Sequence, residues 1–370
     1  MPSFLLYSDW LTALGGGERY LYAIADAVGN EGEVTIAGPE LPDGERMQRL
    51  GFSSAYRVRE IGRPSLPSET AAYDVFVHLT TRLPMRSAAG RSVAIVQFPA
   101  DNAGAVRCWR HPRGRLRSGR PRLALSGYEF IVYSDFVRGW LRRRWHVDAE
   151  VLTPPLLLNG DQPSLDELLP QKHPQILSVG RFFGDGRMKR QGVLIEAYRR
   201  LPAGTRRGWR LVLAGSVGAD GRSRVLIESL RSSAEGLDVR FALDQPPWAL
   251  EALFCSSSIY WHAAGFGRPS WRPDRAEHFG MATVEAMSRA AAPVVFPDGG
   301  QREIVTPGVG RTWYSVEQLV ELTSAFTEDP ALLAAYQRRA YDASSAYSLA
   351  IFQSRARALL APGLGAASSQ

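Results

Sequence analysis

Short apolar runs recur along the chain, each followed by a turn and a segment with helical spacing. Val/Ile-rich runs bounded by loops are typical of strands buried in a parallel sheet. We expect strands at residues 4–9, 34–38, 74–79, 92–98 and 129–135, and a second series at 175–182, 209–216, 237–243, 257–264 and 292–300. Two successive β/α series predict an α/β protein with two doubly wound domains and a ligand cleft between the carboxyl ends of their sheets.

A proline-rich stretch at residues 153–174 separates the two series and indicates a domain boundary. We place the first domain at residues 1–170 and the second at residues 171–346. Residues 347–370 are expected to form a last helix and a frayed tail. A chain of 370 residues has the length of two ordinary domains.

The composition is that of an ordinary globular protein, with 45% hydrophobic residues and a mean hydropathy of -0.17. No apolar span is long enough for a transmembrane helix, and the first residues lack the basic start of a signal peptide. The two cysteines, Cys108 and Cys255, favour neither a disulfide framework nor a metal site. We therefore expect a cytoplasmic protein.

The net charge of +7 is concentrated in one stretch, Arg107–Arg122, where arginines crowd together without an acidic residue. A solvated loop or helix face is the favoured interpretation, because charge runs commonly have no other role. Peripheral contact with an anionic membrane at its inner face, or with an anionic acceptor, comes second. Nucleic acid comes last, because no nucleic-acid-binding motif accompanies the charge.

The stretch EHFGMATVEAM at residues 277–287 is the most informative segment. Glu277 precedes a glycine, and Glu285 is expected in the first turn of a helix that has Thr283 as its N-cap. A helix N-terminus after a glycine suits an anion or a polyhydroxyl ligand. Because carboxylates repel phosphate, the two glutamates are better interpreted as acceptors for ligand hydroxyl groups. Phosphate together with hydroxyls indicates a sugar nucleotide.

Other segments are expected to contribute to the same cleft. Arg181 and Lys189 lie at the carboxyl edge of the second sheet and could hold a diphosphate; exposed loop charges are the alternative. The glycine run Gly15–Gly17 could approach a diphosphate through its backbone or simply form a tight turn, and it does not match the dinucleotide-binding pattern. Gly299 and Gly300 precede a further expected helix N-terminus.

Together these segments resemble the GT-B glycosyltransferases, and within them the retaining family-4 (group 1) enzymes. The residues that carry the resemblance are GGGER at 15–19, ILSVGRF and KRQ within 176–191, and EHFGMATVEAM with GGQREIV from residue 277. Residues 261–280 resemble the branch that contains lipid-linked-oligosaccharide mannosyltransferases. The resemblance implies two Rossmann-like domains facing across a cleft, with the last helix packed back on the first.

The resemblance also implies an activity: transfer of a hexosyl unit from GDP-mannose or a UDP-sugar to a hydroxyl of a glycan, lipid-linked or small-molecule acceptor. Arg181 and Lys189 would bind the donor diphosphate, and Glu277 the donor sugar. Glu285 would accept hydrogen bonds from the ribose. Backbone groups would contribute further donor contacts at Gly16, Gly17, Phe279, Gly280 and Met281. No metal or other cofactor is expected, because fixed cations take the place of a metal.

The sequence departs from the family pattern in the first domain, where Gln97 stands at the position of a histidine that many relatives place near the donor sugar. Glutamine can form hydrogen bonds but cannot titrate. Asp101 and His262 could also contact the acceptor or donor sugar; a solvated carboxylate and a structural histidine are the alternatives. Two rival functions remain: a GT-B sugar-nucleotide epimerase, and a non-catalytic basic protein that binds nucleic acid.

Overall fold

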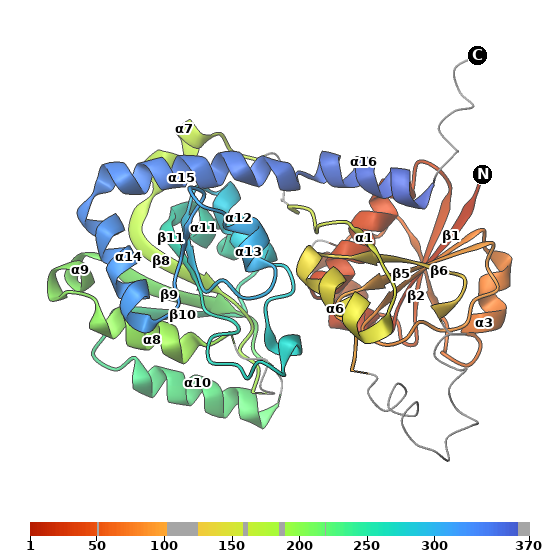
Figure 1. The fold of residues 1–370 in the computed structure, drawn as a ribbon, viewed down its shortest axis with the longest axis horizontal. Helices are drawn as coiled ribbons and strands as arrows, with labels where there is room; N and C mark the ends of the chain where they lie inside the picture. Colours follow the sequence, from red (N-terminus) through yellow and green to blue (C-terminus); the bar gives the residue numbers. More distant parts are fainter. Residues whose placement is uncertain (50–51, 102–124, 158–161, 185–188, 219, 362–370) are drawn as a thin grey trace. The chain divides into compact units, whose positions relative to one another are not determined.

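The structure is a computed structural model that describes residues 1–49, 52–101, 125–157, 162–184, 189–218 and 220–361 (Figure 1). The chain divides into two compact units. The first unit comprises Met1–Pro155 and Ser348–Gln370, and the second comprises Leu156–Tyr347. The Arg107–Arg122 stretch lies outside the described residues, so the prediction of a membrane contact stays a prediction.

Within its described residues, the first unit contains a seven-stranded sheet in the order β3-β2-β1-β4-β5-β6-β7. All neighbouring strands are parallel. The interior strands are buried nearly from end to end, as expected for a parallel sheet covered on both faces. The strands are β1 (Ser3–Ser8), β2 (Glu33–Gly38), β3 (Arg57–Glu60), β4 (Val75–Thr80), β5 (Arg91–Val96), β6 (Tyr128–Val132) and β7 (Glu150–Val151).

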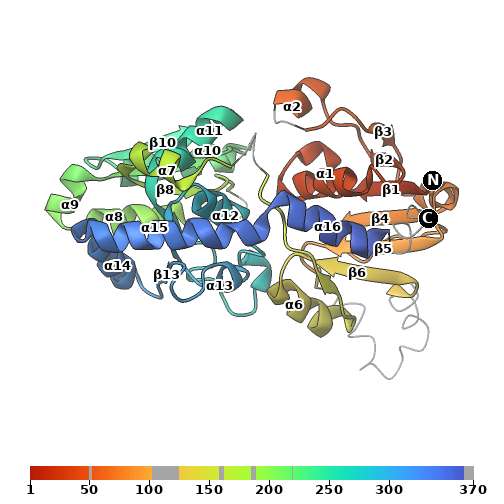
Figure 2. The same cartoon turned by 90° about the horizontal axis from the view of Figure 1, so that it is seen from above.

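Helices cover this sheet, and the C-terminal helix is among them (Figure 2). Helix α16 packs on α1, where the Phe352 ring meets the Tyr20 ring edge-on at 5.2 Å. The Arg91 guanidinium donates to the carbonyl of Leu360 at 3.0 Å and so fixes the end of α16. The helices are α1 (Gly16–Val28), α2 (Gly44–Arg49), α3 (Leu66–Glu69), α6 (Asp135–Trp145) and α16 (Leu349–Leu360).

The described part of the second unit contains a six-stranded sheet in the order β10-β9-β8-β11-β12-β13, again with all neighbours parallel. Trp261, fully buried in the sheet, donates its indole N–H to the Thr323 hydroxyl at 3.1 Å and joins the sheet to α14. The strands are β8 (His173–Val179), β9 (Arg210–Gly215), β10 (Val239–Leu243), β11 (Ser257–His262), β12 (Ala292–Val295) and β13 (Arg311–Thr312).

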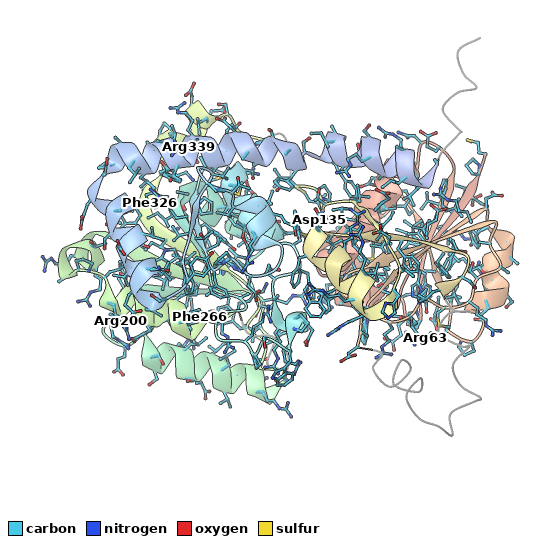
Figure 3. All side chains as sticks on the ribbon, viewed as in Figure 1. Arg63, Asp135, Arg200, Phe266, Phe326 and Arg339 are labelled. Carbon is cyan, nitrogen blue, oxygen red and sulfur yellow. The ribbon has the colours of Figure 1, made fainter. Side chains whose placement is uncertain are left out.

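Helices pack around the second sheet, and α14 and α15 pack on each other through the Phe326 and Tyr336 rings, whose centroids are 5.0 Å apart. Phe326 and Phe266 are both labelled on this unit in Figure 3. The helices are α7 (Leu165–Leu168), α8 (Gln191–Arg200), α9 (Ala203–Gly208), α10 (Gly221–Ser233), α11 (Pro247–Ser256), α12 (Met281–Ser288), α13 (Gln301–Ile304), α14 (Val316–Glu328) and α15 (Pro330–Ser344).

The strand order reverses direction once in each sheet, between β1 and β4 in the first unit and between β8 and β11 in the second. The loops that leave neighbouring strands at such a switch point run to opposite faces of the sheet. A crevice then opens at the carboxyl ends of the strands, and ligands of doubly wound proteins bind there. The two switch points are therefore the places to look for functional residues.

The domain boundaries differ from those expected from the sequence. Residues 156–170 belong to the second unit by their contacts, although we placed them in the first domain. The backbone explains the difference, because the Leu156 amide donates to the Tyr347 carbonyl at 2.7 Å. The Tyr341 hydroxyl also donates to the carbonyl of Pro163 at 3.1 Å. From Leu156 onward, the proline-rich stretch therefore belongs to the second unit.

Candidate active site

A carboxylate, an ammonium group and an imidazole meet at the β8/β11 switch point of the second unit. His262 is the last residue of β11, and its Nε2 lies 2.9 Å from Oε2 of Glu277. The Lys189 ammonium, just before α8, donates to the same carboxylate oxygen. The side chains of Glu277 and Lys189 are 17% and 30% exposed, so the pair is largely shielded but still reachable from solvent. Three predicted site residues are therefore in direct contact.

The protonation states in this cluster follow from its surroundings. Burial alone would raise the pKa of Glu277, but the Lys189 charge and the hydrogen bond with His262 outweigh it and hold that pKa well below its usual range. Burial lowers the pKa of His262, which is therefore neutral at pH 7. An ionised carboxylate only accepts hydrogen bonds, so Nε2 of His262 carries the proton that it shares with Glu277. Among the described residues, Nδ1 of His262 has no hydrogen-bond partner.

Two consecutive glycines hold the segment that carries Glu277. The amide of Gly300 donates to the Glu277 carbonyl at 2.8 Å. Gly299 has a φ of +67°, and a Cβ at this position would lie 1.9 Å from that carbonyl oxygen. A Cβ on Gly300 would lie 2.6 Å from the Cα of Phe279. Any larger residue at either position would displace Glu277, so the PDGG turn acts as its support.

The amide of the residue before α13 is thus bonded to the Glu277 carbonyl, and the ligand-binding helix end predicted at Gly299 and Gly300 stays a prediction. Helix α13 spans only Gln301–Ile304, and Gly300 precedes it as the N-cap residue. The glycines bring this short helix against the EHFG segment. Their role in the structure is to position Glu277.

Helix α12 begins at Met281, after Gly280, which has a φ of +127°. The prediction that Thr283 is the N-cap was wrong: Thr283 lies inside the first turn, and its hydroxyl accepts from the side-chain amide of Gln301 at 2.9 Å. A Cβ on Gly280 would lie 2.5 Å from the same amide nitrogen, which explains the glycine. Glu285 is the fifth residue of the helix and so lies in its second turn.

The Thr283 amide already donates to the Gly280 carbonyl at 2.9 Å, so the N–H groups of Met281 and Ala282 are the ones that can serve a ligand at this end of α12. The backbone at Phe279 and Gly280 leads directly into it. Phe279, Gly280 and Met281 thus lie at the start of a helix, where its dipole is positive, and their donor contacts stay a prediction.

Arg181 follows β8 at the same sheet edge, and its guanidinium lies over the Phe183 ring at 5.4 Å. Arg181 is exposed. The Lys189 side chain crosses the backbone at Gly180, where a Cβ would lie 2.6 Å from Cγ of the lysine. The two predicted cations therefore flank the end of one strand, although Lys189 is the one that contacts Glu277.

The predicted residues of the first unit lie around the N-terminus of α1. The Gly15 amide donates to the Glu18 carboxylate at 2.9 Å, so a side chain of the chain itself caps this helix. The side-chain amide of Gln97 lies over Gly17, where a Cβ would be 2.0 Å away, and donates to the Tyr133 hydroxyl at 3.2 Å. Asp101 is exposed. Donor contacts at Gly16 and Gly17 stay a prediction.

A salt bridge that the sequence analysis missed anchors the loop after β11. Arg268 forms a bidentate salt bridge with Asp298, in which Nη2 donates a 2.8 Å hydrogen bond to Oδ1 and Nε donates to Oδ2. Gly265, with a φ of +89°, leaves the space that Asp298 fills. The loop is thereby attached to the PDGG turn under Glu277. Asp298 precedes the glycines directly, but the sequence does not show which of the many arginines pairs with it.

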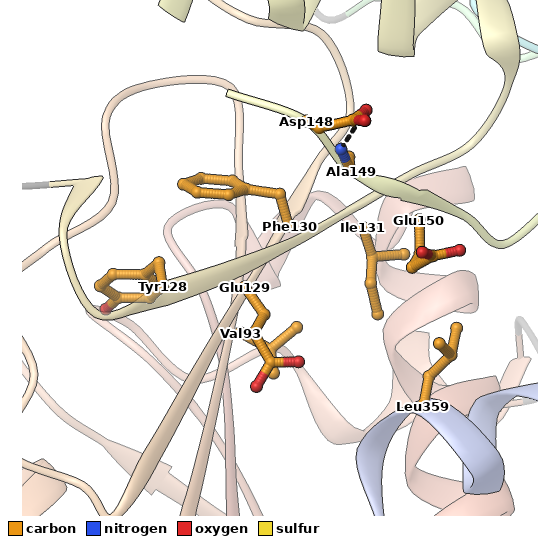
Figure 4. A pocket seen from close by; sticks show the side chains of 9 residues that line it. All are labelled: Val93, Tyr128, Glu129, Phe130, Ile131, Asp148, Ala149, Glu150 and Leu359. Atoms are coloured by element: carbon orange, nitrogen blue, oxygen red, sulfur yellow. Dashed lines mark hydrogen bonds between the residues drawn. The ribbon is translucent and has the colours of Figure 1, made fainter. Parts of the chain in front are cut away.

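A cavity of about 310 Å³ in the first unit is not suited to the donor (Figure 4). It lies toward the amino ends of β5 and β6, away from the carboxyl edge of the sheet. Its lining includes the carboxylates of Glu129, Asp148 and Glu150, and the arginines that pair with the first two are already bound to them. The other residues that line it are Val93, Tyr128, Phe130, Ile131, Ala149 and Leu359.

The described part of the chain holds no cluster of three or more His, Cys, Asp or Glu side chains arranged as metal ligands. None of the described helices is long and apolar enough to cross a membrane.

The two doubly wound parallel units have the fold of the GT-B class. Solved structures of this class match nearly the whole chain. WaaG, a glycosyltransferase involved in lipopolysaccharide biosynthesis, matches with a TM-score of 0.69 at 15% identity, over 98% of this chain and 100% of WaaG.

Two further solved structures are as similar. HepE from Anabaena, in complex with UDP and glucose, has a TM-score of 0.70 at 14% identity, covering 97% of this chain and 99% of HepE. Sucrose-phosphate synthase from Thermosynechococcus elongatus has a TM-score of 0.69 at 17% identity, covering 97% of this chain and 98% of the synthase. At these identities the likeness shows the fold.

Residues 164–343 match the family model of glycosyl transferases group 1. The match lies within the second unit, and Lys189, His262, Glu277 and Glu285 are all inside the matched range. A comparison with curated protein sequences found no match.

Proposed function

We propose that this chain is a retaining family-4 glycosyltransferase that moves a hexosyl unit from a nucleoside diphosphate sugar to an acceptor hydroxyl. The observation that carries the proposal is the contact of Glu277 with both Lys189 and His262 at the β8/β11 switch point, beside the N-terminus of α12. The group 1 match over residues 164–343 supports it independently.

The diphosphate is assigned to Lys189, Arg181 and the first amides of α12. As the bond to the sugar breaks, negative charge grows on the leaving diphosphate, and fixed cations stabilise that charge more than they stabilise the substrate. Lys189 is already held in place by Glu277, so little reorganisation precedes its contact with phosphate. Two fixed cations and a helix end can take the place of a metal ion, and we propose a metal-independent transfer.

Glu277 is assigned to the hydroxyls of the donor sugar and Glu285 to the ribose. A carboxylate whose pKa is held well below the usual range, against the opposing effect of burial, stays ionised at every physiological pH. Glu277 is therefore unsuited to general acid or base chemistry, which needs a pKa near the working pH. It is suited to accepting hydrogen bonds, and neutral His262 fixes its orientation.

UDP-sugars are the first donors to test, since HepE is described in complexes with UDP and with UDP-glucose. Thermal-shift measurements with UDP, GDP, ADP and dTDP sugars, GDP-mannose among them, identify the nucleotide. A ligand at about 100 times its Kd stabilises the folded state by about 2.7 kcal/mol, which is readily detected.

Transfer is then measured with the selected donor and a panel of glycan, lipid-linked and small-molecule acceptors. NMR of the product reports whether the anomeric configuration of the donor is retained. The expected result is a retained glycoside that forms equally well with EDTA present. Release of nucleoside diphosphate with an epimerised sugar and no glycoside would instead identify an epimerase. If no nucleotide sugar raises the melting temperature, the proposal is wrong.

A further inference from the structure

A second polar cluster lies at the β1/β4 switch point of the first unit. Tyr7 of β1 and His78 of β4 are adjacent in register and fully buried. Asp9 follows β1 and has a side chain that is only 7% exposed. Arg63, labelled in Figure 3, reaches it from beyond β3 and binds both carboxylate oxygens, with Nε 2.7 Å from Oδ1.

The buried members of this cluster are incompletely satisfied. The Met85 amide donates to Nδ1 of His78 at 3.4 Å, so the proton of the neutral ring is on Nε2. That Nε2 lies 3.8 Å from Oδ2 of Asp9, too far for a hydrogen bond. The Tyr7 hydroxyl also has no hydrogen-bond partner within the described residues. Apolar side chains would be more stable here, which points to a function for the polar ones.

An exposed tryptophan follows the cluster in the chain. Trp10 is 53% exposed, although its backbone is fixed on both sides. Its amide donates to the Ser8 hydroxyl at 3.1 Å, and its carbonyl accepts from the Ala13 amide at 2.8 Å. An exposed indole on a fixed backbone, at the carboxyl edge of a parallel sheet, is accessible to a ligand without any ordering of the main chain.

We propose that Trp10 and Arg63 form a subsite for a neutral pyranose, the acceptor of the transfer. The C–H face of the sugar ring stacks on the indole, and the guanidinium donates hydrogen bonds to ring hydroxyls. The charges favour a neutral sugar over a phosphorylated one, because Asp9 neutralises Arg63. Asp9 is the positioning residue: it is nearly buried, while the Arg63 side chain is 38% exposed and keeps N–H groups beyond the two bound to Asp9.

Sugar binding at this place does not depend on the donor site, whereas its role as the acceptor subsite rests on the proposed function. The two can therefore be tested separately. Indole ¹⁵N-labelled protein is titrated with methyl glucopyranoside and methyl mannopyranoside, and the Trp10 signal is assigned by its loss in Trp10→Phe. We expect a saturable shift of the Trp10 signal with at least one of these sugars and no comparable shift with UDP.

Arg63→Lys keeps the positive charge beside Asp9 but lacks the planar fork of N–H groups, so the sugar Kd should rise about tenfold. Tyr314→Ala, which removes a 62% exposed aromatic ring of the second unit beside the edge strand β13, is the matched control and should leave the Kd unchanged. Absence of a saturable shift with either sugar, or an equal Kd in Arg63→Lys, overturns the subsite.

Transfer to p-nitrophenyl glucoside and mannoside tests the acceptor role. Trp10→Ala should raise the KM for the acceptor about tenfold and leave the donor KM unchanged, while Trp10→Phe stays close to the parent protein. If transfer proceeds and Trp10→Ala leaves the acceptor KM unchanged, the acceptor assignment is wrong although the proposed function stands. If the Trp10 signal shifts but no nucleotide sugar binds, the subsite stands and the proposed function fails.

Discussion

Replacing Glu277 by glutamine separates the two kinds of ligand that the site is proposed to bind. The change keeps the size of the side chain and removes its negative charge. In the structure that charge contacts Lys189 and His262 in a position that is only 17% exposed. A nucleoside diphosphate without sugar meets Glu277 only as a nearby like charge. A nucleoside diphosphate sugar also uses it as a hydrogen-bond acceptor.

The magnitudes follow from these two roles. A like charge about 7 Å from the diphosphate, at an effective dielectric constant of about 20, opposes binding by roughly 2 kcal/mol. Lys189 and salt reduce this to about 1 kcal/mol, so the variant should bind the diphosphate about fivefold more tightly. Hydrogen bonds from sugar hydroxyls to a carboxylate contribute about 2 kcal/mol. Their loss outweighs the gain and should leave the nucleotide sugar bound about fivefold more weakly.

Isothermal titration calorimetry of both ligands with both proteins measures the effect. The preference for nucleotide sugar over nucleoside diphosphate should fall by about 30-fold, equivalent to about 2 kcal/mol. Glu251→Gln is the matched control, because Glu251 also pairs with a buried cation of the second unit, Arg289, but lies on α11. It should leave the preference unchanged.

An unchanged preference in Glu277→Gln would refute the assignment of this carboxylate to the sugar. Weaker binding of both ligands by the same factor would refute it too, because such a loss is typical of a collapsed site. A second, internal check is acid stability. Since the folded-state pKa of Glu277 is depressed, its contribution is complete above the unfolded value of about 4.5 and is lost as the pH falls below it. The stability difference between parent and variant should shrink there.

Four further predictions follow from the same geometry. Lys189→Met should reduce turnover by about 10²- to 10³-fold in steady-state assays, because a fixed charge at the leaving group is lost. Glu285→Ala should weaken binding of the nucleoside diphosphate about tenfold in calorimetry, through the lost ribose contact. Gly299→Ala places a Cβ 1.9 Å from the Glu277 carbonyl oxygen and should lower the free energy of unfolding by at least about 2 kcal/mol in urea titrations. Burial lowers the pKa of His78, so the unfolded state takes up its proton first; stability should fall by up to about 1.4 kcal/mol per pH unit below pH 6.5, and His78→Gln should flatten this slope.

The sequence predicted the interior of both sheets because burial on two faces leaves a continuous apolar signal. The expected strand at 257–264 is β11 (Ser257–His262), and the one at 34–38 is β2 (Glu33–Gly38). The same reasoning found the edge strand β10 (Val239–Leu243), predicted at 237–243, but failed at the other sheet edges. β3 (Arg57–Glu60) is charged and partly exposed, and β7 and β13 have two residues each, so none carries an apolar run.

The sequence singled out the residues of the proposed donor site, but not the contacts between them. Lys189 stands out at the carboxyl edge of the second sheet, and Glu277 stands out before a glycine and an expected helix. That they touch each other depends on the adjacency of β8 and β11, which comes from the strand order and not from any local pattern. The N-cap of α12 was assigned to the wrong residue for a related reason. The side-chain amide of Gln301, far along the chain, donates to the Thr283 hydroxyl, which a local N-cap would have used as acceptor for a helix amide.

The two switch points contain the same three kinds of group, but they differ in how well these groups satisfy one another. In the second unit, the histidine is 2.9 Å from the carboxylate, so the acceptor geometry at Glu277 exists before any ligand arrives. In the first unit, the corresponding distance from His78 to Asp9 is 3.8 Å, and the cation takes both carboxylate oxygens. A preorganised carboxylate suits a transferred sugar whose orientation decides the reaction. A neutralised ion pair beside an exposed indole suits a partner that only has to be held, and this difference supports the proposal that donor and acceptor bind to different units.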